Sequence, residues 1–312
     1  MAITDHIPHI PNPPPGQLRP CPVSTFTGRM PFSYKGPGPD SSLSGETAYS
    51  VWGDLASGKT PLLVIHGGPD MDYDIPVVMY DQIGCGQSSR FKDQAGNESL
   101  WTVEMFVEEL AAMIKHLHID QFDLLGHSWG GCLCGNFAIR TQPSGLRKLI
   151  ICNSPPSLKL MEPEVQDVID RCEAADSFDS TEGQAAMQYA YTLHGCRVKP
   201  WPRELMACLL GLAEEKTVYK PMAGSSAFTM KGSIMSVPGL ENRIREITEK
   251  TCPGGLLVVT AEFDLASKDL HSLWFEEPKC KVKHVHLKLS SHSVMLQETE
   301  DLMKAIGSFL DS

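Results

Sequence analysis

The sequence predicts an α/β fold, a mostly parallel sheet with helices on both faces. Short continuous apolar runs, typical of strands buried on both sides, alternate with segments of helical periodicity. A Gly-x-Ser-x-Gly turn at residues 126–130 joins one apolar run to one helical segment. A long stretch of largely helical pattern then interrupts the alternation before the apolar runs resume. Such an arrangement places functional groups at the carboxyl edge of the sheet.

The elements follow from local pattern. Residues 24–34 and 46–55 are strand-like and separated by a Gly/Pro/Ser-rich turn, which indicates an antiparallel start. We expect buried parallel strands at 61–66, 76–81, the run that begins at Phe122, 149–152, 255–260 and 285–289. We expect helices at 102–118, 132–140 and 299–310.

The chain of 312 residues can hold one large α/β domain with an insertion. We expect the core to comprise residues 24–156 and 246–312, and residues 157–245 to form an inserted helical cap. Residues 1–23 are rich in proline and are expected to be a flexible lead-in.

The composition argues against several classes of protein. A formal net charge of −11 disfavours a nucleic-acid partner, because phosphate binding needs a basic face. No run approaches the roughly 18 apolar residues that cross a bilayer, and residues 1–20 lack the apolar core of a secretion signal. Ten cysteines without a paired framework fit free thiols in the cytoplasm. Cys132 and Cys134 lack nearby ligands and are expected to be packing residues rather than a metal site.

Ser128 is the candidate nucleophile. A sharp strand-to-helix turn lifts a serine hydroxyl out of the sheet, and Gly126 and Gly130 leave room for so tight a bend. A serine hydroxyl also needs a base that is itself oriented by an acid.

The base and the acid are expected after the serine, in loops that follow later strands. His292 follows the last strand and is the candidate base. Asp264 follows the strand at 255–260 and is the candidate acid; Glu262 is a nearby rival, and a helix N-cap is the plainer interpretation of Asp264. His127, inside the turn, is expected to pack beneath it.

An oxyanion formed at this serine needs backbone donors aimed at it. The amide of Trp129, next to the serine, is one candidate. The glycine-rich turn after the strand at 61–66 offers the other, with Gly68 favoured and Gly67 next.

These motifs resemble the proline iminopeptidase family of α/β-hydrolases, especially fungal-type amino-acid amidases and proline-specific peptidases. The resemblance rests on His-Gly-Gly-Pro at 66–69, Tyr-Asp-Gln-Ile-Gly-Cys-Gly at 80–86 and Gly-His-Ser-Trp-Gly-Gly at 126–131, and extends into the cap at 194–197, 200–202 and 218–224. It implies removal of an N-terminal residue, often proline, from a small peptide or amide, without metal or cofactor.

Three features depart from the family pattern. Only residues 68–75 link the strands at 61–66 and 76–81; extended, they span roughly 27 Å, which is too little for a crossover helix. Ala227 stands where the family has a carboxylate for the substrate ammonium. Leu265 stands where a second glutamate often follows the acid.

Three functions therefore remain open. The first is an aminopeptidase or amidase, and the second is an esterase, thioesterase or cyclase that tailors a secondary metabolite. The third is a non-catalytic binding protein, which the presence of all three candidate side chains disfavours. In either enzyme, Trp201, Tyr219 and Phe228 of the cap are expected to line an apolar substrate pocket.

Overall fold

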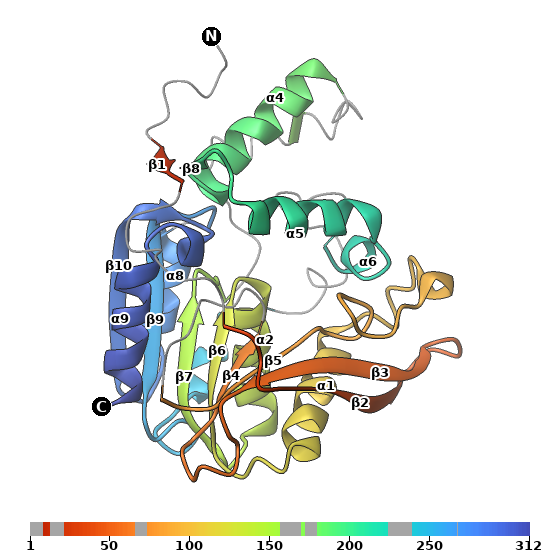
Figure 1. Ribbon diagram of the computed structural model, residues 1–312, viewed down its shortest axis with the longest axis vertical. Helices are drawn as coiled ribbons and strands as arrows, with labels where there is room; N and C mark the ends of the chain where they lie inside the picture. The colour runs from red at the N-terminus through yellow and green to blue at the C-terminus, as the bar shows by residue number, and fades with distance from the viewer. Residues whose placement is uncertain are drawn as a thin grey trace.

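The computed structural model describes residues 9–12, 22–65, 74–156, 170–171, 180–223, 239–266 and 268–312. Its main body is an eight-stranded sheet with the order β10-β9-β7-β6-β4-β5-β3-β2 (Figure 1). Neighbouring strands from β5 to β10 pair in parallel, whereas β3 is antiparallel to both β5 and β2. The strands are β2 (Phe26–Lys35), β3 (Ser42–Trp52), β4 (Leu62–Ile65), β5 (Val77–Tyr80), β6 (Phe122–His127), β7 (Leu146–Cys152), β9 (Leu256–Phe263) and β10 (Val282–Ser291).

Helices cover both faces of the sheet, as the sequence predicts. One apolar core lies beneath α1 (Val103–His116), α2 (Trp129–Thr141) and α8 (Lys268–Glu276). A second apolar core, on the opposite face, is closed by α9 (Thr299–Leu310). The middle strands are buried on both sides, which explains their unbroken apolar runs.

The described part of the cap lies above the carboxyl edge of the sheet (Figure 1). It contains α4 (Thr181–Ala190), a π-helical turn (Tyr191–Gly195), β8 (Val198–Lys199), α5 (Arg203–Glu214) and α6 (Tyr219–Ala223). Below, these described residues 180–223 are called the cap segment.

One short strand was not expected in the cap. β8 pairs in parallel with β1 (Ile10–Pro11), and Ile10 packs against Cys196 and Val198. The flexible lead-in expected at residues 1–23 does not account for this pairing. The pairing places residues 9–12 against the cap segment. A strand of two residues is too short to show the alternation of polar and apolar residues. The sequence pattern therefore could not predict β1 or β8.

The link between β4 and β5 is short, as its sequence indicates. The two strands are parallel neighbours, with Leu62 opposite Val77. Residues 66–76 join them, and residues 66–73 lie outside the described part of the chain.

Candidate active site

Ser128 occupies a strained position between β6 and α2. Its φ of 55° and ψ of −126° place a non-glycine residue in the left-handed region. A Cβ at Gly126 would overlap the backbone of Gly130, and a Cβ at Gly130 would overlap the Ile65 carbonyl. The glycines of the motif are therefore required by the close approach of β4, β6 and the start of α2.

Asp264 and His292 come together because β9 and β10 are neighbouring parallel strands. Asp264 follows β9 directly, and His292 follows β10 directly. The pairing of the two strands is irregular between Leu287 and Ser291, just before His292. Both side chains therefore emerge side by side at the carboxyl edge, close to the turn that carries Ser128.

The three candidate side chains form one hydrogen-bonded line. Ser128 Oγ lies 2.8 Å from His292 Nε2. His292 Nδ1 lies 2.7 Å from Asp264 Oδ1. The acid is only 4% exposed, so the imidazole lies between a buried carboxylate and the serine hydroxyl.

The environment of Asp264 keeps its carboxylate ionised. Burial acts to raise its pKa, but the neighbouring imidazoles, first His292 and then His271, outweigh burial and hold the pKa well below its usual range. The rival Glu262 instead lies within 2.8 Å of His286 and 3.0 Å of Lys268. Asp264, not Glu262, therefore contacts the candidate base.

Two further histidines hold the backbone of these loops. His127 is mostly buried, and its Nε2 lies 2.7 Å from the carbonyl oxygen of His292. His194 Nδ1 lies 3.1 Å from the Phe263 carbonyl oxygen and 3.3 Å from that of Asp264. The sequence predicts packing for His127 and carries no signal for the contacts of His194.

The cap segment is joined to the loop that carries His292. The amide of His292 donates to the His194 carbonyl at 2.9 Å, and the amide of Ser293 donates to Gly195 at 3.0 Å. Both acceptors belong to the π-helical turn, a form that often occurs at functional sites. The position of His292 thus depends on residues almost a hundred positions earlier, which local pattern could not show.

Trp129 is held by the Tyr-Asp-Gln motif that begins at Tyr80, the last residue of β5. Its indole Nε1 donates to Gln82 Oε1 at 3.1 Å. The next residue, Ile83, donates its amide to the buried Glu109 at 2.7 Å. Burial raises the pKa of Glu109 to about 8, although hydrogen bonds from Thr47 and Ile83 act to lower it. The motif thus fixes the residue that follows Ser128, a role the sequence analysis did not assign.

The candidate oxyanion donors are described only in part. Trp129 begins α2, and the first amides of a helix have no intrahelical acceptor. This amide is therefore available next to Ser128. Gly67 and Gly68 lie outside the described residues.

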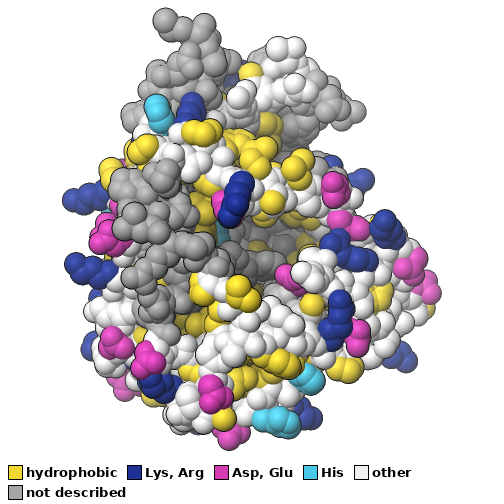
Figure 2. Space-filling view, in the orientation of Figure 1, with side chains coloured by type: hydrophobic (Ala, Val, Ile, Leu, Met, Phe, Trp, Pro, Cys, Tyr) yellow, Lys and Arg dark blue, Asp and Glu magenta, His cyan; other side chains and the backbone are white. Residues whose placement is uncertain are grey.

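The predicted pocket residues are also described only in part. Trp201 is half-buried, and its Nε1 donates to the Cys196 carbonyl at 3.1 Å. Tyr219 begins α6, and its buried hydroxyl has no hydrogen-bond partner among the described residues. Phe228 lies outside the described part of the chain. Apolar side chains gather at the surface over α5, where Met206 and Leu210 are exposed, and the surface is hollowed below them (Figure 2).

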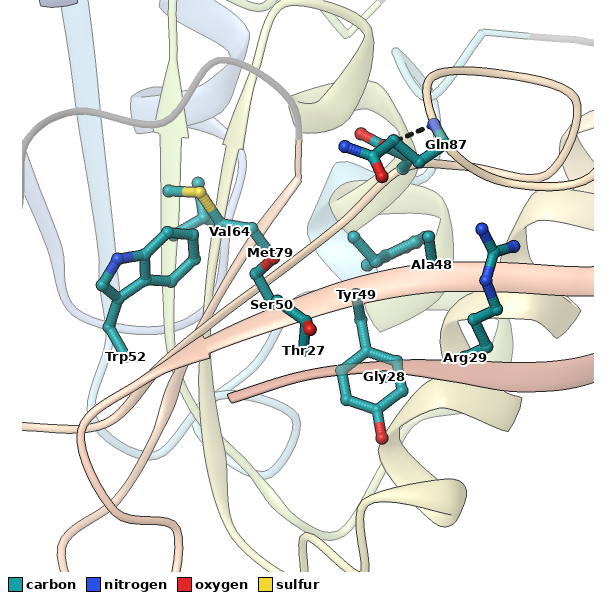
Figure 3. Close-up of a pocket in the computed structure, with 12 residues that line it drawn as sticks. Thr27, Gly28, Arg29, Ala48, Tyr49, Ser50, Trp52, Val64, Met79 and Gln87 are labelled. Carbon is teal, nitrogen blue, oxygen red and sulfur yellow. Dashed lines mark hydrogen bonds between the residues drawn. The ribbon is translucent and has the colours of Figure 1, made fainter. Parts of the chain in front are cut away.

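A separate hollow of about 690 Å³ opens over β2, β3 and β5 (Figure 3). Of the residues that line it, Val64 belongs to the core on the α9 face, and Trp52 and Met79 pack against that core. Ser128, Asp264 and His292 do not line this hollow.

Among the described residues, no group of three His, Cys, Asp or Glu side chains could hold a metal ion. Within the same residues, no helix has the length and apolar character to cross a membrane.

Fold and site geometry together define the class of protein, an α/β-hydrolase. The alpha/beta hydrolase fold family matches residues 60–190. The solved structure of VinJ has a TM-score of 0.77 and 31% identity, and the match covers 93% of this chain and 99% of that one. A proline iminopeptidase from Mycobacterium smegmatis has a TM-score of 0.74 and 28% identity, with 90% and 98% covered.

Comparison of sequences identifies the family within the α/β-hydrolases. A proline iminopeptidase from Heyndrickxia coagulans is 33% identical over 282 residues, which cover 83% of this chain and 93% of that relative. One from Clostridium botulinum is 25% identical over 86% of this chain and 96% of that relative. The chain belongs to the proline iminopeptidase family of α/β-hydrolases and is a serine hydrolase of that type.

Proposed function

We propose that this enzyme removes an N-terminal residue from a small peptide or amide by way of an acyl-enzyme. The observation that carries the proposal is the hydrogen-bonded line from Ser128 Oγ through His292 to Asp264. The names of the relatives support an amino-terminal substrate. Ser128 is the proposed nucleophile, His292 the base and Asp264 the acid that orients it.

In the first half of the reaction, His292 Nε2 accepts the proton of Ser128 as Oγ attacks the substrate carbonyl carbon. Asp264 Oδ1 holds Nδ1–H and stabilises the imidazolium that forms. The oxyanion is stabilised by the Trp129 amide and, in this proposal, by Gly68 or Gly67. His292 then gives its proton to the departing amine, which leaves an ester on Ser128.

In the second half, water attacks the ester carbonyl and His292 accepts its proton. Collapse of the second tetrahedral intermediate returns that proton to Ser128 Oγ and releases the acid. Each step uses groups of the chain and water alone. Trp201, Tyr219 and Phe228 are proposed to close an apolar pocket over the reacting bond.

A neutral ester or thioester is the second candidate substrate, which would suit the tailoring of a secondary metabolite. Leu265, directly after the acid, offers no charge to a substrate ammonium, and Ala227 offers none in the cap. Glu262 pairs with Lys268 and His286 at the surface. Burial of an ammonium without a partner is costly, and this cost favours a neutral substrate.

The test compares a prolyl arylamide with an N-blocked prolyl ester, with Ser128→Ala as the blank. Turnover of the arylamide that is lost on N-blocking is expected for an aminopeptidase. Turnover of the blocked ester alone would contradict this proposal and show that the enzyme is an esterase.

We also propose that the enzyme acts in the cytoplasm. This proposal rests on ten cysteines without a paired framework, which fit free thiols in a reducing compartment. Fractionation of cells that produce the tagged chain tests it, and enzyme recovered in the secreted fraction would contradict it.

A further inference from the structure

The two oxygens of Asp264 have different surroundings. Oδ1 lies 2.7 Å from His292 Nδ1 and accepts the Leu265 amide at 2.7 Å. Oδ2 is buried and accepts no hydrogen bond from the described residues. His271 Nε2 lies 3.3 Å from Oδ2, without the alignment of a full hydrogen bond. A buried carboxylate oxygen without a donor is unfavourable, and His271 is placed to supply one.

We propose that His271 is a positioning residue, whose Nε2–H faces Asp264 Oδ2 and keeps Oδ1 on His292 during catalysis. His271 lies in the first turns of α8 and is 3% exposed. The acid thus lies between two imidazoles, one that moves protons and one that holds the carboxylate. This inference rests on the proposed roles of Ser128, His292 and Asp264.

The position of α8 does not depend on the His271 imidazole. Trp274 is fully buried, and its Nε1 donates to the Ser154 carbonyl at 2.6 Å. The same indole lies against Gly135 of α2. Phe275 stacks on His284 of β10, with ring centroids 4.3 Å apart. With the helix anchored at these residues, loss of the imidazole donor acts on the carboxylate and leaves α8 in place.

A positioning role makes a different prediction from a packing role. Glutamine carries an N–H donor at a similar reach to histidine Nε2, so His271→Gln keeps the donor. His271→Leu and His271→Phe keep apolar bulk and remove the donor. His116→Gln is the matched control, because His116 is exposed at the end of α1 and its imidazole contacts Tyr49 rather than Asp264 or α8.

The experiment measures the rate of Ser128 labelling by a fluorophosphonate, together with kcat, KM and Tm for each variant. Loss of a hydrogen bond to a charged group corresponds to roughly a ten- to hundredfold fall in rate. We expect that fall in labelling rate and kcat for His271→Leu and His271→Phe, with KM unchanged. We expect His271→Gln to stay within a fewfold of wild type, and the control His116→Gln to match wild type.

Two outcomes would overturn the role of His271. One is wild-type labelling in folded His271→Leu or His271→Phe, and the other is equal impairment of the Gln, Leu and Phe variants. Absence of labelling in folded wild-type enzyme would overturn the triad and His271 together. Failure to turn over the prolyl arylamide, with labelling intact, would count against the proposed substrate alone.

Discussion

The guanidinium of Arg197 lies 3.7 Å from the ring centroid of Phe263, the residue before Asp264. Arg197 is 5% exposed, and its Nη1 donates to the Leu289 carbonyl at 2.6 Å. Burial lowers the pKa of Arg197, although the charge of Glu298 acts to raise it. One cap side chain thus contacts the strand that leads to the acid and the strand that leads to the base.

Arg197→Met is expected to destabilise the protein and slow catalysis. The variant keeps much of the apolar stem but loses the cation–π contact and the donor to Leu289. Together these interactions contribute about 2–3 kcal/mol. Urea denaturation should show a lower midpoint, and kcat should fall several-fold as the loops of Asp264 and His292 loosen. Arg203→Met, at a 92% exposed side chain of the same cap segment, is the control. Equal effects of the two substitutions would contradict this role.

Asp264→Asn is expected to abolish nearly all activity without unfolding the enzyme. The amide removes the charge that stabilises the imidazolium, and it can hold the wrong tautomer of His292. In a serine protease with such a triad, the same change lowers kcat by about four orders of magnitude. Single-turnover acylation and Tm measure the two effects separately. A Glu262→Gln variant should retain activity, because Glu262 pairs with Lys268 and His286. Loss of activity in that variant alone would reverse the choice of acid.

The fold was predictable because its signals are local. The apolar runs of β4, β6 and β7 are continuous since those strands are buried on both faces. The predicted α/β-hydrolase class is confirmed, and the helix expected at 299–310 begins and ends where α9 does. Ser128, Asp264 and His292 could be proposed because each follows a recognisable strand. The structure brings them together, and their catalytic roles stay predictions.

The rest of the site depends on contacts that form only in the folded chain. His271 follows Asp264 closely in the sequence, but no pattern shows that their side chains meet, because α8 must first fold back against β9. The hydrogen bond between Gln82 and Trp129 likewise joins two loops that only the sheet brings together. The π-helical turn and its carbonyl contacts to His292 have no periodic signal at all. Gly67, Gly68 and Phe228 lie outside the described residues, so their roles also stay predictions.

Glu109 is expected to make stability fall as pH rises. Its pKa is about 8 in the folded protein against a usual value of 4.5, so the folded state retains a proton that the unfolded state loses. The contribution of Glu109 to the free energy of unfolding is therefore fully present below about pH 4.5. It declines as pH rises to about 8, by at most about 1.4 kcal/mol per pH unit. Glu109→Gln should remove this dependence and gain stability relative to wild type from pH 5 to pH 8. Urea denaturation at pH 5 and at pH 8 measures this gain in stability. Glu108→Gln, at the exposed neighbouring position, is the control. If the free energy of unfolding changes with pH in the same way in wild type and Glu109→Gln, this role of Glu109 is wrong.

Ile10 of β1 is expected to stabilise the cap segment without taking part in catalysis. Its side chain is 8% exposed against Cys196 and Val198, and its amide donates to the Arg197 carbonyl at 2.8 Å. Ile10→Ala removes buried apolar surface worth about 2 kcal/mol. Thermal inactivation should therefore be faster, whereas kcat at 25 °C should hold, because the carbonyls of His194 and Gly195 still bind the His292 loop.

Pro11 provides the control for Ile10, because it follows on the same strand and is exposed. Pro11→Ala should leave the half-life of activity near that of wild type. If Ile10→Ala lowers kcat at 25 °C as strongly as it shortens the half-life, β1 contributes to the geometry of the triad through Arg197. If neither variant changes the half-life, the pairing of β1 with β8 does not stabilise the cap segment. Protection of the Ile10 amide against hydrogen exchange gives an independent measure, because that amide is bonded only while β1 stays paired.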